Sequence, residues 1–364
     1  MSEILAVALA GAAGGVAIIG AVTVLVVLCL RHRRRTSDSS ESNSSGPTLS
    51  DRQGARCMTL EELSSATNNF SYSNLIGHGM FGEVFNGLLQ DGTIIAVKRR
   101  RSPPSQEFVQ EVNNLSSIHH RNLVKLLGYC QDNGMQMLVY EYVPNGSVST
   151  YLHGNGHSPS VKLEFKQRLS VALGTAKGLS HLHSLTPPAV HMNFKTVNVL
   201  VDEDFTPKVA DAGIRGLLDR LGSAGPSSRI SDDPFLDPRG KESMDFSIPS
   251  DVYSFGVFLV ELISGRRAVS DKSIIERVQN FQDSSDIFAI ADSRMTSGFT
   301  SEGMKELLRL ASLCVNPTSE HRPSMISVEA EIHRICEQEI RLTTVMPEVT
   351  ATVTLGSQLF TPSR

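Results

Sequence analysis

The strongest constraint on the fold is a group of closely spaced glycines between two strand-like runs. Gly77, Gly79 and Gly82 form a G-x-G-x-x-G spacing, and glycines let backbone N–H groups close over a triphosphate without side-chain clashes. The same spacing also introduces dinucleotide-binding folds, where a helix follows it. Here a turn at residues 90–92 leads into a further strand over residues 93–98. The order of elements therefore indicates a β-hairpin that covers phosphate groups.

That second strand ends in a lysine with a candidate carboxylate partner. Glu111 lies thirteen residues after Lys98, within a stretch (residues 105–119) where apolar residues recur at helical spacing. Glu111 adjoins this apolar stripe. We expect Lys98 and Glu111 to form an ion pair; the alternative is two solvated surface charges.

A dense group of polar residues lies near the middle of the chain. Asn193, Lys195 and Asn198 follow a long apolar-periodic helix expected over residues 163–185, and Asp211 comes thirteen residues after Asn198. Alone, this H-x-N-x-x-x-x-N spacing would be a weak signal. It becomes informative only because the glycine loop and Lys98 precede it in the sequence at suitable distances.

Together these motifs resemble those of a protein kinase, and two further stretches resemble plant receptor-like protein kinases. The two stretches are SATNNFS at residues 65–71 and NLVKLLGYC at residues 122–130. The resemblance covers residues 59–336. It implies an α+β, bilobal protein-kinase fold, with a small mainly-β N-lobe that carries one helix, a larger α-helical C-lobe, and ATP with Mg²⁺ in the cleft.

The resemblance also implies which residues face the nucleotide. Lys98 would bind the α- and β-phosphates, backbone groups of Glu141 and Val143 would contact adenine, and Tyr140 would flank the pocket. The expected nucleotide-binding residues are Ile76, Gly77, Gly79, Gly82, Val84, Ala96, Lys98, Glu111, Glu141, Val143 and Leu200.

The catalytic and metal positions match only in part. Asn198 and Asp211 correspond to the two side chains that hold magnesium in a kinase, and Lys195 keeps its catalytic position. Asn193 stands where the catalytic Asp accepts the proton of the substrate hydroxyl, and a neutral amide cannot accept it near pH 7. Loss of a general base costs about 10²–10⁴ in rate. Because phosphoryl transfer depends mainly on positioning and metal, a trace of activity is compatible with this change.

Three further departures lie on the same segments. Met192 replaces an Arg that grips a phosphorylated activation loop, and Ala212 replaces the Phe whose packing helps to set the active state. Arg239 replaces a Glu that pairs with the Arg matched here by Arg322, and two cations cannot make that bridge. The segment between Asp211 and Arg239 also lacks the G-T-x-G-Y motif of the family, so the resemblance does not extend to the platform that binds the substrate.

Other helical patterns complete the larger lobe. Asp251 opens an apolar helix that stops near Gly265. We expect its buried carboxylate to accept hydrogen bonds from the backbone of the catalytic loop. Considered without the other motifs, Asp251 could equally be an ordinary acidic residue at a helix N-terminus. The remaining expected helices cover residues 59–67, which open with a capping box at Thr59 and Glu62, and residues 273–290, 302–314 and 324–340.

The first 30 residues indicate a membrane anchor. Ile4 to Leu30 is a run of 27 uncharged residues, and as a helix it would be roughly 40 Å long, enough to span a bilayer with some tilt. A cleaved signal peptide is disfavoured because no basic residue precedes the long run. The basic residues 31–35 place the following chain in the cytoplasm, at the plasma membrane.

Composition excludes several alternatives. The net charge of −4 gives no electrostatic argument for nucleic acid. Five widely spaced cysteines without C-x-x-C pairs fit a reducing compartment better than a disulfide framework or a zinc site.

The expected organisation has six parts. They are an extracellular stub at residues 1–3, a transmembrane helix at 4–30, a basic and Ser-rich juxtamembrane linker at 31–58, a kinase N-lobe at 59–143, a C-lobe at 144–340 and a flexible tail at 341–364.

Two functional hypotheses follow. The first is a membrane-tethered pseudokinase that binds ATP, is catalytically impaired, and acts as a scaffold or co-receptor for other receptor-like kinases or cytosolic signalling proteins. The second is an active Ser/Thr kinase of low rate. A third, a kinase fold kept as a structural module without nucleotide, is disfavoured because Lys98, Glu111, Asn198 and Asp211 persist.

Overall fold

The computed structural model describes six stretches of the chain. They are residues 54–154, 163–222, 233–239, 246–282, 287–295 and 299–345. The expected transmembrane helix at 4–30, nearly all of the linker, and the end of the tail lie outside these residues. Within the described stretches, no helix combines the length and apolarity needed to cross a bilayer.

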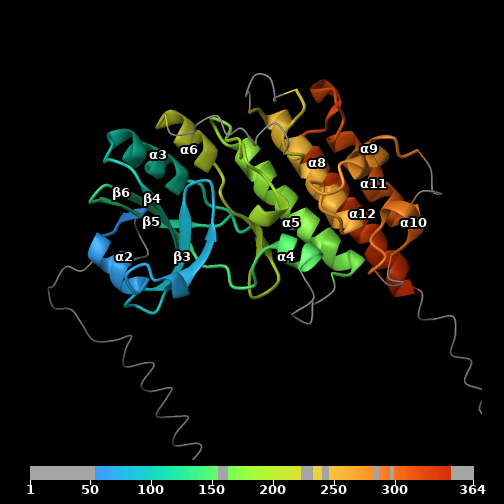
Figure 1. The fold of residues 1–364 in the computed structure, drawn as a ribbon. Helices are drawn as coiled ribbons and strands as arrows, with labels where there is room; N and C mark the ends of the chain where they lie inside the picture. The colour runs from blue at the N-terminus through green and yellow to red at the C-terminus, as the bar shows by residue number, and fades with distance from the viewer. Residues whose placement is uncertain are drawn as a thin grey trace, which may run out of the picture. The chain divides into compact units, whose positions relative to one another are not determined.

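The N-lobe is a six-stranded sheet with two helices (Figure 1). The strand order is β1-β5-β6-β4-β3-β2, and every pairing is antiparallel except β1 with β5. The elements are β1 (Arg56–Cys57), α2 (Leu60–Ala66), the 3₁₀ turn η1 (Tyr72–Asn74), β2 (Leu75–His78), β3 (Glu83–Leu88), β4 (Ile94–Arg101), α3 (Gln106–Ser116), β5 (Leu126–Asp132) and β6 (Met135–Glu141).

The side chains of β4 point alternately to the two faces of the sheet, and two separate clusters of the N-lobe core lie on these faces. Ile95 and Val97 are fully buried in a cluster beneath α2 that includes Leu63. Ala96 and Lys98, which point to the other face of the sheet, lie on the side of α3 and the cleft. The hairpin predicted from the glycine loop therefore presents its polar lysine to the cleft.

The start of α2 confirms the expected N-cap. The Thr59 side chain accepts a hydrogen bond from the Glu62 N–H at 3.1 Å. The Glu62 carboxylate pairs with Arg56 instead of turning back to the backbone of Thr59, so α2 has only one half of the expected capping box.

The last residues of the expected linker belong to the sheet. Arg56 pairs with Gly128, and Cys57 pairs with Tyr129, in the parallel register of β1 and β5. Met58, which follows them, is buried. The folded N-lobe thus begins before residue 59.

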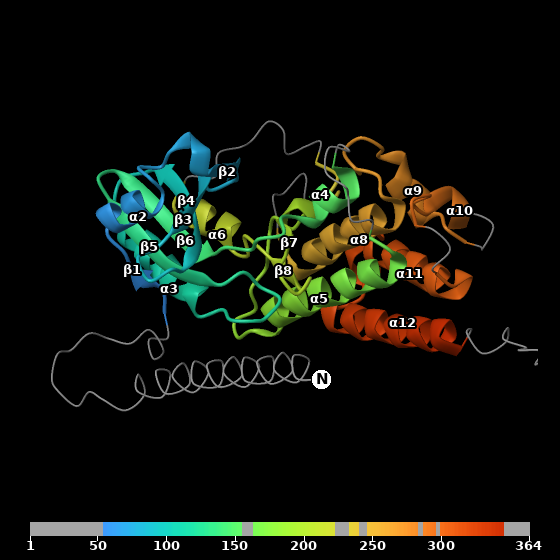
Figure 2. The ribbon, with the colours of Figure 1, turned by 90° about the horizontal axis from the view of Figure 1, so that it is seen from below.

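The C-lobe is helical and is built around one buried helix, α8 (Ile248–Ser264) (Figure 2). The helix ends where the sequence predicts, at Gly265, which lies in the left-handed region with φ of 65°. It begins three residues before the expected start at Asp251, with Pro249 in its first turn. The other elements are α4 (Val148–His153), α5 (Phe165–Ser184), η2 (Thr196–Asn198), β7 (Val199–Val201), β8 (Pro207–Val209), α6 (Ile214–Arg220), α9 (Ser273–Gln279), α10 (Ile287–Ile290), α11 (Ser301–Cys314), η5 (Ser319–His321) and α12 (Met325–Val345).

Two differences from the expected helices stand out. The single helical pattern over residues 273–290 is two short helices, α9 and α10. Helix α6, directly after Gly213, was not expected at all. The bilobal arrangement itself agrees with the expected fold.

Candidate nucleotide-binding and catalytic site

The predicted site residues come from both lobes. The N-lobe strands β2, β3 and β4 carry Ile76, Gly77, Val84, Ala96 and Lys98, and the β2–β3 connection carries Gly79 and Gly82. Glu111 lies on α3, Glu141 ends β6, and Val143 follows it. Lys195 precedes η2 and Asn198 is its last residue. Leu200 lies on β7, and Asp211 follows β8.

Asp251 fixes the backbone of the catalytic loop, as expected. Its carboxylate, 2 % exposed, accepts hydrogen bonds from the N–H of His191 at 2.7 Å and of Met192 at 3.0 Å. It also contacts His183 Nε2 at 2.9 Å. Three donors on one buried carboxylate hold the loop in one conformation.

His191 ties the same loop to the strand before Asp211. Its Nε2 lies 2.9 Å from the carbonyl oxygen of Ala210, and its Nδ1 lies 3.4 Å from the N–H of Asn193. Burial lowers the pKa of His191, and the nearby Asp251 opposes this shift. A neutral ring that donates from Nε2 and accepts at Nδ1 satisfies both contacts.

The polar side chains that follow Asn193 have partners within the protein. Asn198 Nδ2 donates to the backbone oxygen of Asn193 at 2.9 Å, and the Lys195 ammonium pairs with Asp233. Since an amide offers no basic oxygen near neutral pH, residue 193 supplies no general base in this arrangement.

The expected pair of Lys98 and Glu111 is wrong for this structure. Lys98 Nζ pairs with Asp211, and both side chains are about nine-tenths buried. Glu111 pairs instead with Arg220, at the end of α6. The two charges that the sequence suggested as partners have therefore each taken a partner from the segment that follows the catalytic loop.

Helix α6 causes this exchange. Its apolar residues Ile214, Leu217 and Leu218 are buried in the N-lobe cluster formed by α3 and the sheet. Figure 1 and Figure 2 show α6 beside α3 and near the sheet. The C-lobe segment that begins at Gly213 therefore completes the core of the other lobe.

The glycine loop is folded down into the same cluster. Phe81, at the tip of the loop, is 3 % exposed and stacks with Phe108 of α3 at a centroid distance of 6.4 Å. The Arg100 guanidinium lies 5.2 Å from the Phe81 ring centroid. A Cβ added to Gly79 would lie 3.9 Å from Asp211 Oδ2, so the loop backbone lies close above that carboxylate.

In this arrangement the residues do not fit bound ATP and magnesium. The Lys98 ammonium and the Asp211 carboxylate, predicted to bind phosphate and metal, neutralise each other. Tyr140, which was expected to flank the nucleotide pocket, is buried, and its ring centroid lies 5.5 Å from Lys98 Nζ.

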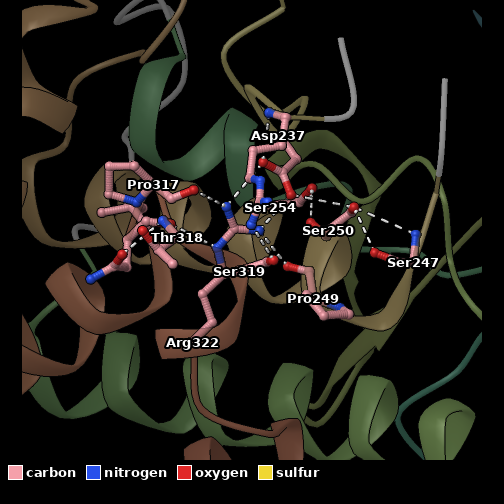
Figure 3. A network of polar contacts seen from close by, with 12 residues as sticks. Asp237, Ser247, Pro249, Ser250, Ser254, Pro317, Thr318, Ser319 and Arg322 are labelled. Carbon is pink, nitrogen blue, oxygen red and sulfur yellow. Dashed lines mark hydrogen bonds and ion pairs between the residues drawn. The ribbon is translucent and has the colours of Figure 1, made fainter. Parts of the chain in front are cut away.

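A second correction concerns the expected loss of the bridge to Arg322. Arg239 indeed does not pair with it. Arg322 instead makes two hydrogen bonds to Asp237, two residues earlier, one of them 2.9 Å long (Figure 3). Arg239 turns outward to Glu320, at 2.9 Å. The structural bridge survives with a different acid.

Three features of this site did not follow from the sequence. They are the burial of Phe81, the pairing of Arg322 with Asp237, and helix α6. In α6, the apolar residues Ile214, Leu217, Leu218 and Leu221 follow the i, i+3, i+4, i+7 spacing of a helical stripe. That signal was available.

The two lobes, the hinge after β6 and the catalytic loop held by Asp251 define a protein-kinase domain. Residues 70–332 match the protein tyrosine and serine/threonine kinase family, and the chain belongs to it.

The relatives of the chain include plant receptor-like kinases. A putative leucine-rich repeat receptor-like serine/threonine-protein kinase of Arabidopsis thaliana is 38% identical over 91% of this chain and 36% of its own length. The proline-rich receptor-like protein kinase PERK3 of the same plant is 37% identical over 87% of this chain and 64% of its own length. The chain thus spans about a third to two thirds of these relatives.

Among solved structures, the pseudokinase domain of BIR2 is similar to this chain. It is described as an immune regulator of the RLK/Pelle family. The two superpose with a TM-score of 0.65 at 30% sequence identity, over 77% of this chain and 86% of that one.

Proposed function

We propose that this protein is a membrane-anchored, kinase-like signalling protein that acts through protein contacts and transfers phosphate weakly or not at all. The observation that carries the proposal is Asn193 at the position of the catalytic base. Replacement of a general base alone lowers the rate by about 10²–10⁴, or roughly 3–5 kcal/mol of barrier. The partners we propose are other receptor-like kinases or cytosolic signalling proteins.

The arrangement of the other charged side chains supports the same proposal. Lys98 with Asp211 and Lys195 with Asp233 are paired within the protein, and none of these four is free to receive a substrate without breaking an ion pair. The similarity to a pseudokinase domain adds support. ATP and magnesium, which protein kinase domains in general bind, would need this set of pairs to open.

An active serine/threonine kinase of low rate is the second candidate. It is favoured by one observation: the side chains of Lys98, Asn198 and Asp211 all persist. In a loose phosphoryl transfer, positioning and metal do most of the work.

Phosphate transfer separates the two candidates. The full-length protein, Asn193→Asp and Lys98→Ala are compared for transfer of radiolabelled phosphate from ATP to the protein itself and to a generic acceptor protein. We expect no transfer above the Lys98→Ala background for the unmodified chain, and a rise for Asn193→Asp. Transfer by the unmodified chain that disappears in Lys98→Ala would contradict the proposal and favour the weak kinase.

Anchoring is tested separately by fractionation. We propose that residues 4–30 hold the protein in the plasma membrane with the kinase domain in the cytoplasm. The full chain should sediment with membranes and resist extraction by alkaline carbonate, whereas a chain lacking residues 1–35 should be found in the supernatant. Recovery of the full chain in the supernatant would exclude the anchor.

A further inference from the structure

We propose that a pocket beside α4 binds a phosphorylated serine or threonine side chain of a partner protein. This inference rests on the proposed function and deepens it, because it names the chemistry by which a kinase-like protein that works through contacts would recognise a partner. The pocket lies in the C-lobe, where α4 packs against η2 and β7 (Figure 2). None of the residues predicted to bind the nucleotide lines it.

The composition of the pocket favours an anion. It has a volume of about 360 Å³, and its wall comes from α4 with its N-cap, from η2, and from the loop that follows α8. Of the described residues that line it, none is acidic. One carries a positive charge, and three carry hydroxyl groups. The side chains that line the pocket are those of Ser147, Ser149, Thr150, His153, Val197 and Arg267.

Arg267 supplies the positive charge, and its donors are unused. The neighbouring Arg266 pairs with Asp271 at 3.4 Å, whereas the exposed Arg267 guanidinium has no hydrogen bond or ion pair to any described residue. A guanidinium presents five N–H donors in a planar fork that matches two phosphate oxygens at once. Arg267 can therefore bind a phosphate without first breaking a pair.

The acidic groups near the pocket are already engaged. Glu261 is 4 % exposed and accepts a hydrogen bond from the Ala268 N–H at 2.8 Å. Burial raises the pKa of Glu261, and Arg267 is one of the groups that oppose this shift without bonding to it. Asp292 is held by two other arginines. Neither acid takes the donors of Arg267.

The remaining polar side chains offer further donors. Ser147 Oγ lies 3.1 Å from Thr150 Oγ1. Ser149 Oγ lies 3.4 Å from His153 Nδ1. Burial and the nearby Arg267 lower the pKa of His153 to about 4, so its ring is neutral near pH 7 and carries one N–H. A phosphate monoester has three strong acceptor oxygens, and these groups can serve the oxygens that Arg267 leaves open.

The openness of the pocket favours a protein side chain over a small metabolite. Val197 on its rim is 54 % exposed, and Thr150 and Arg267 are exposed as well. Small-molecule sites are more enclosed and mostly apolar, but Val197 is the only apolar side chain among the described residues that line this pocket. A phosphorylated side chain can enter while its main chain stays outside, as in other arginine-based phosphopeptide sites.

Three variants of the full-length protein test the assignment. Arg267→Ala removes the charged fork, and we expect at least tenfold weaker binding of a phosphopeptide. Arg267→Lys keeps the charge but loses the paired donors, and we expect binding about two- to fivefold weaker than that of the unmodified chain. Ser149→Ala removes one hydroxyl donor, with an expected loss of about two- to fivefold.

Arg266→Ala is the matched control. It removes the adjacent, exposed arginine, which pairs with Asp271 and does not line the pocket. We expect it to change the affinity by less than about twofold. An equal loss in Arg266→Ala and Arg267→Ala would mean that only the net charge of this surface matters, and it would overturn the proposed pocket.

The measurement is fluorescence anisotropy of the detergent-solubilised full chain, without ATP. The probe is a degenerate peptide with a fixed central phosphoserine or phosphothreonine, compared with the same peptide unphosphorylated. We expect at least tenfold tighter binding of the phosphorylated peptide, and slower hydrogen exchange at residues 147–154 and 265–268 when it is bound.

Two further probes separate the sources of phosphate. Inorganic phosphate and vesicles that contain phosphatidylinositol phosphates are tested as competitors, and we expect both to be much weaker than the phosphopeptide. The proposal is overturned if both peptides bind equally or not at all, if Arg267→Ala binds like the unmodified chain, or if either competitor matches the phosphopeptide. Because no ATP is present, these outcomes are distinguishable from phosphate transfer by the unmodified chain, which would contradict the proposed function.

Discussion

Arg322 and Asp237 form a buried, two-bonded ion pair between the segment ahead of α8 and the turn ahead of α12. The Arg322 side chain has no exposed surface and the Asp237 side chain is 4 % exposed. The guanidinium also donates to the carbonyl oxygen of Pro249 at 2.9 Å (Figure 3). A further hydrogen bond, of 2.8 Å, goes to the carbonyl oxygen of Asn316. The domain therefore keeps its buried ion pair, although Arg239 stands where the resemblance implies the glutamate that pairs with Arg322.

Removing Asp237 should destabilise the whole domain. Asp237→Ala leaves a buried guanidinium without its charge partner, and we expect a loss of about 3–5 kcal/mol in the free energy of unfolding. Denaturant unfolding measures it. Glu320→Ala is the matched control, because it removes the acid that faces exposed Arg239 and should leave the midpoint unchanged. Equal effects of both variants would refute the assignment.

Asp251 should keep the backbone of the catalytic loop ordered. Asp251→Ala removes the acceptor of the His191 and Met192 amides, and leaving such buried donors unpaired costs about 1–3 kcal/mol each. We expect lower stability and faster hydrogen exchange at these two amides. Asp271→Ala, in an exposed ion pair with Arg266, should change neither; unchanged exchange in Asp251→Ala would speak against this role.

Acid sensitivity should depend in part on Asp292. Burial alone would raise its pKa, but hydrogen bonds from Arg294 and Arg168 outweigh burial and lower the pKa to about 2. Because the pKa is lower in the folded state than in the unfolded state, ionised Asp292 stabilises the fold at pH values above the unfolded pKa of about 3.9. This stabilisation is lost as the pH falls toward 2.

The variant for this test is Asp292→Asn, which cannot titrate. We expect it to be less stable than the unmodified protein at pH 6, and the gap between them to narrow between about pH 4 and pH 2. Urea unfolding at a series of pH values gives the comparison. A gap that stays constant over this range would exclude the contribution.

Gly128 should be necessary for the strand β1. A Cβ on Gly128 would lie 2.8 Å from the Arg56 carbonyl oxygen and 2.7 Å from Met58 Sδ, closer than real Cβ atoms come. Gly128→Ala should therefore displace β1, with a loss of about 1–3 kcal/mol in stability and faster exchange at the Met58 amide. Gly77→Ala, where nothing lies within 4 Å of an added Cβ, should leave that exchange unchanged. If Gly128→Ala leaves the Met58 amide protected, β1 does not depend on this close approach.

Much of the fold follows from local patterns. The helices α3, α5, α8, α11 and α12 lie where apolar residues recur at helical spacing, and each buries that stripe. The N-cap at Thr59 and the donors around Asp251 were also predicted correctly. These features depend on neighbours in sequence or on a single rule, namely that buried carboxylates find donors.

The partners of Lys98 and Arg322 did not follow from the sequence. Two carboxylates, Glu111 and Asp211, were both available to Lys98, and the choice between them is decided by where α6 packs. For Arg322, a shift of two residues along the chain brings Asp237 into reach. Pair choices of this kind depend on the packing of distant segments, which local patterns do not specify.

The strand β1 joins the first described residues of the chain to the N-lobe sheet. Ala55 packs against the same cluster as α3, and the next two residues are bonded along β5. A displacement of residues 55–57 would therefore disturb the edge of the sheet and α3 together, which makes this short strand a joint between the start of the folded domain and its N-lobe helix.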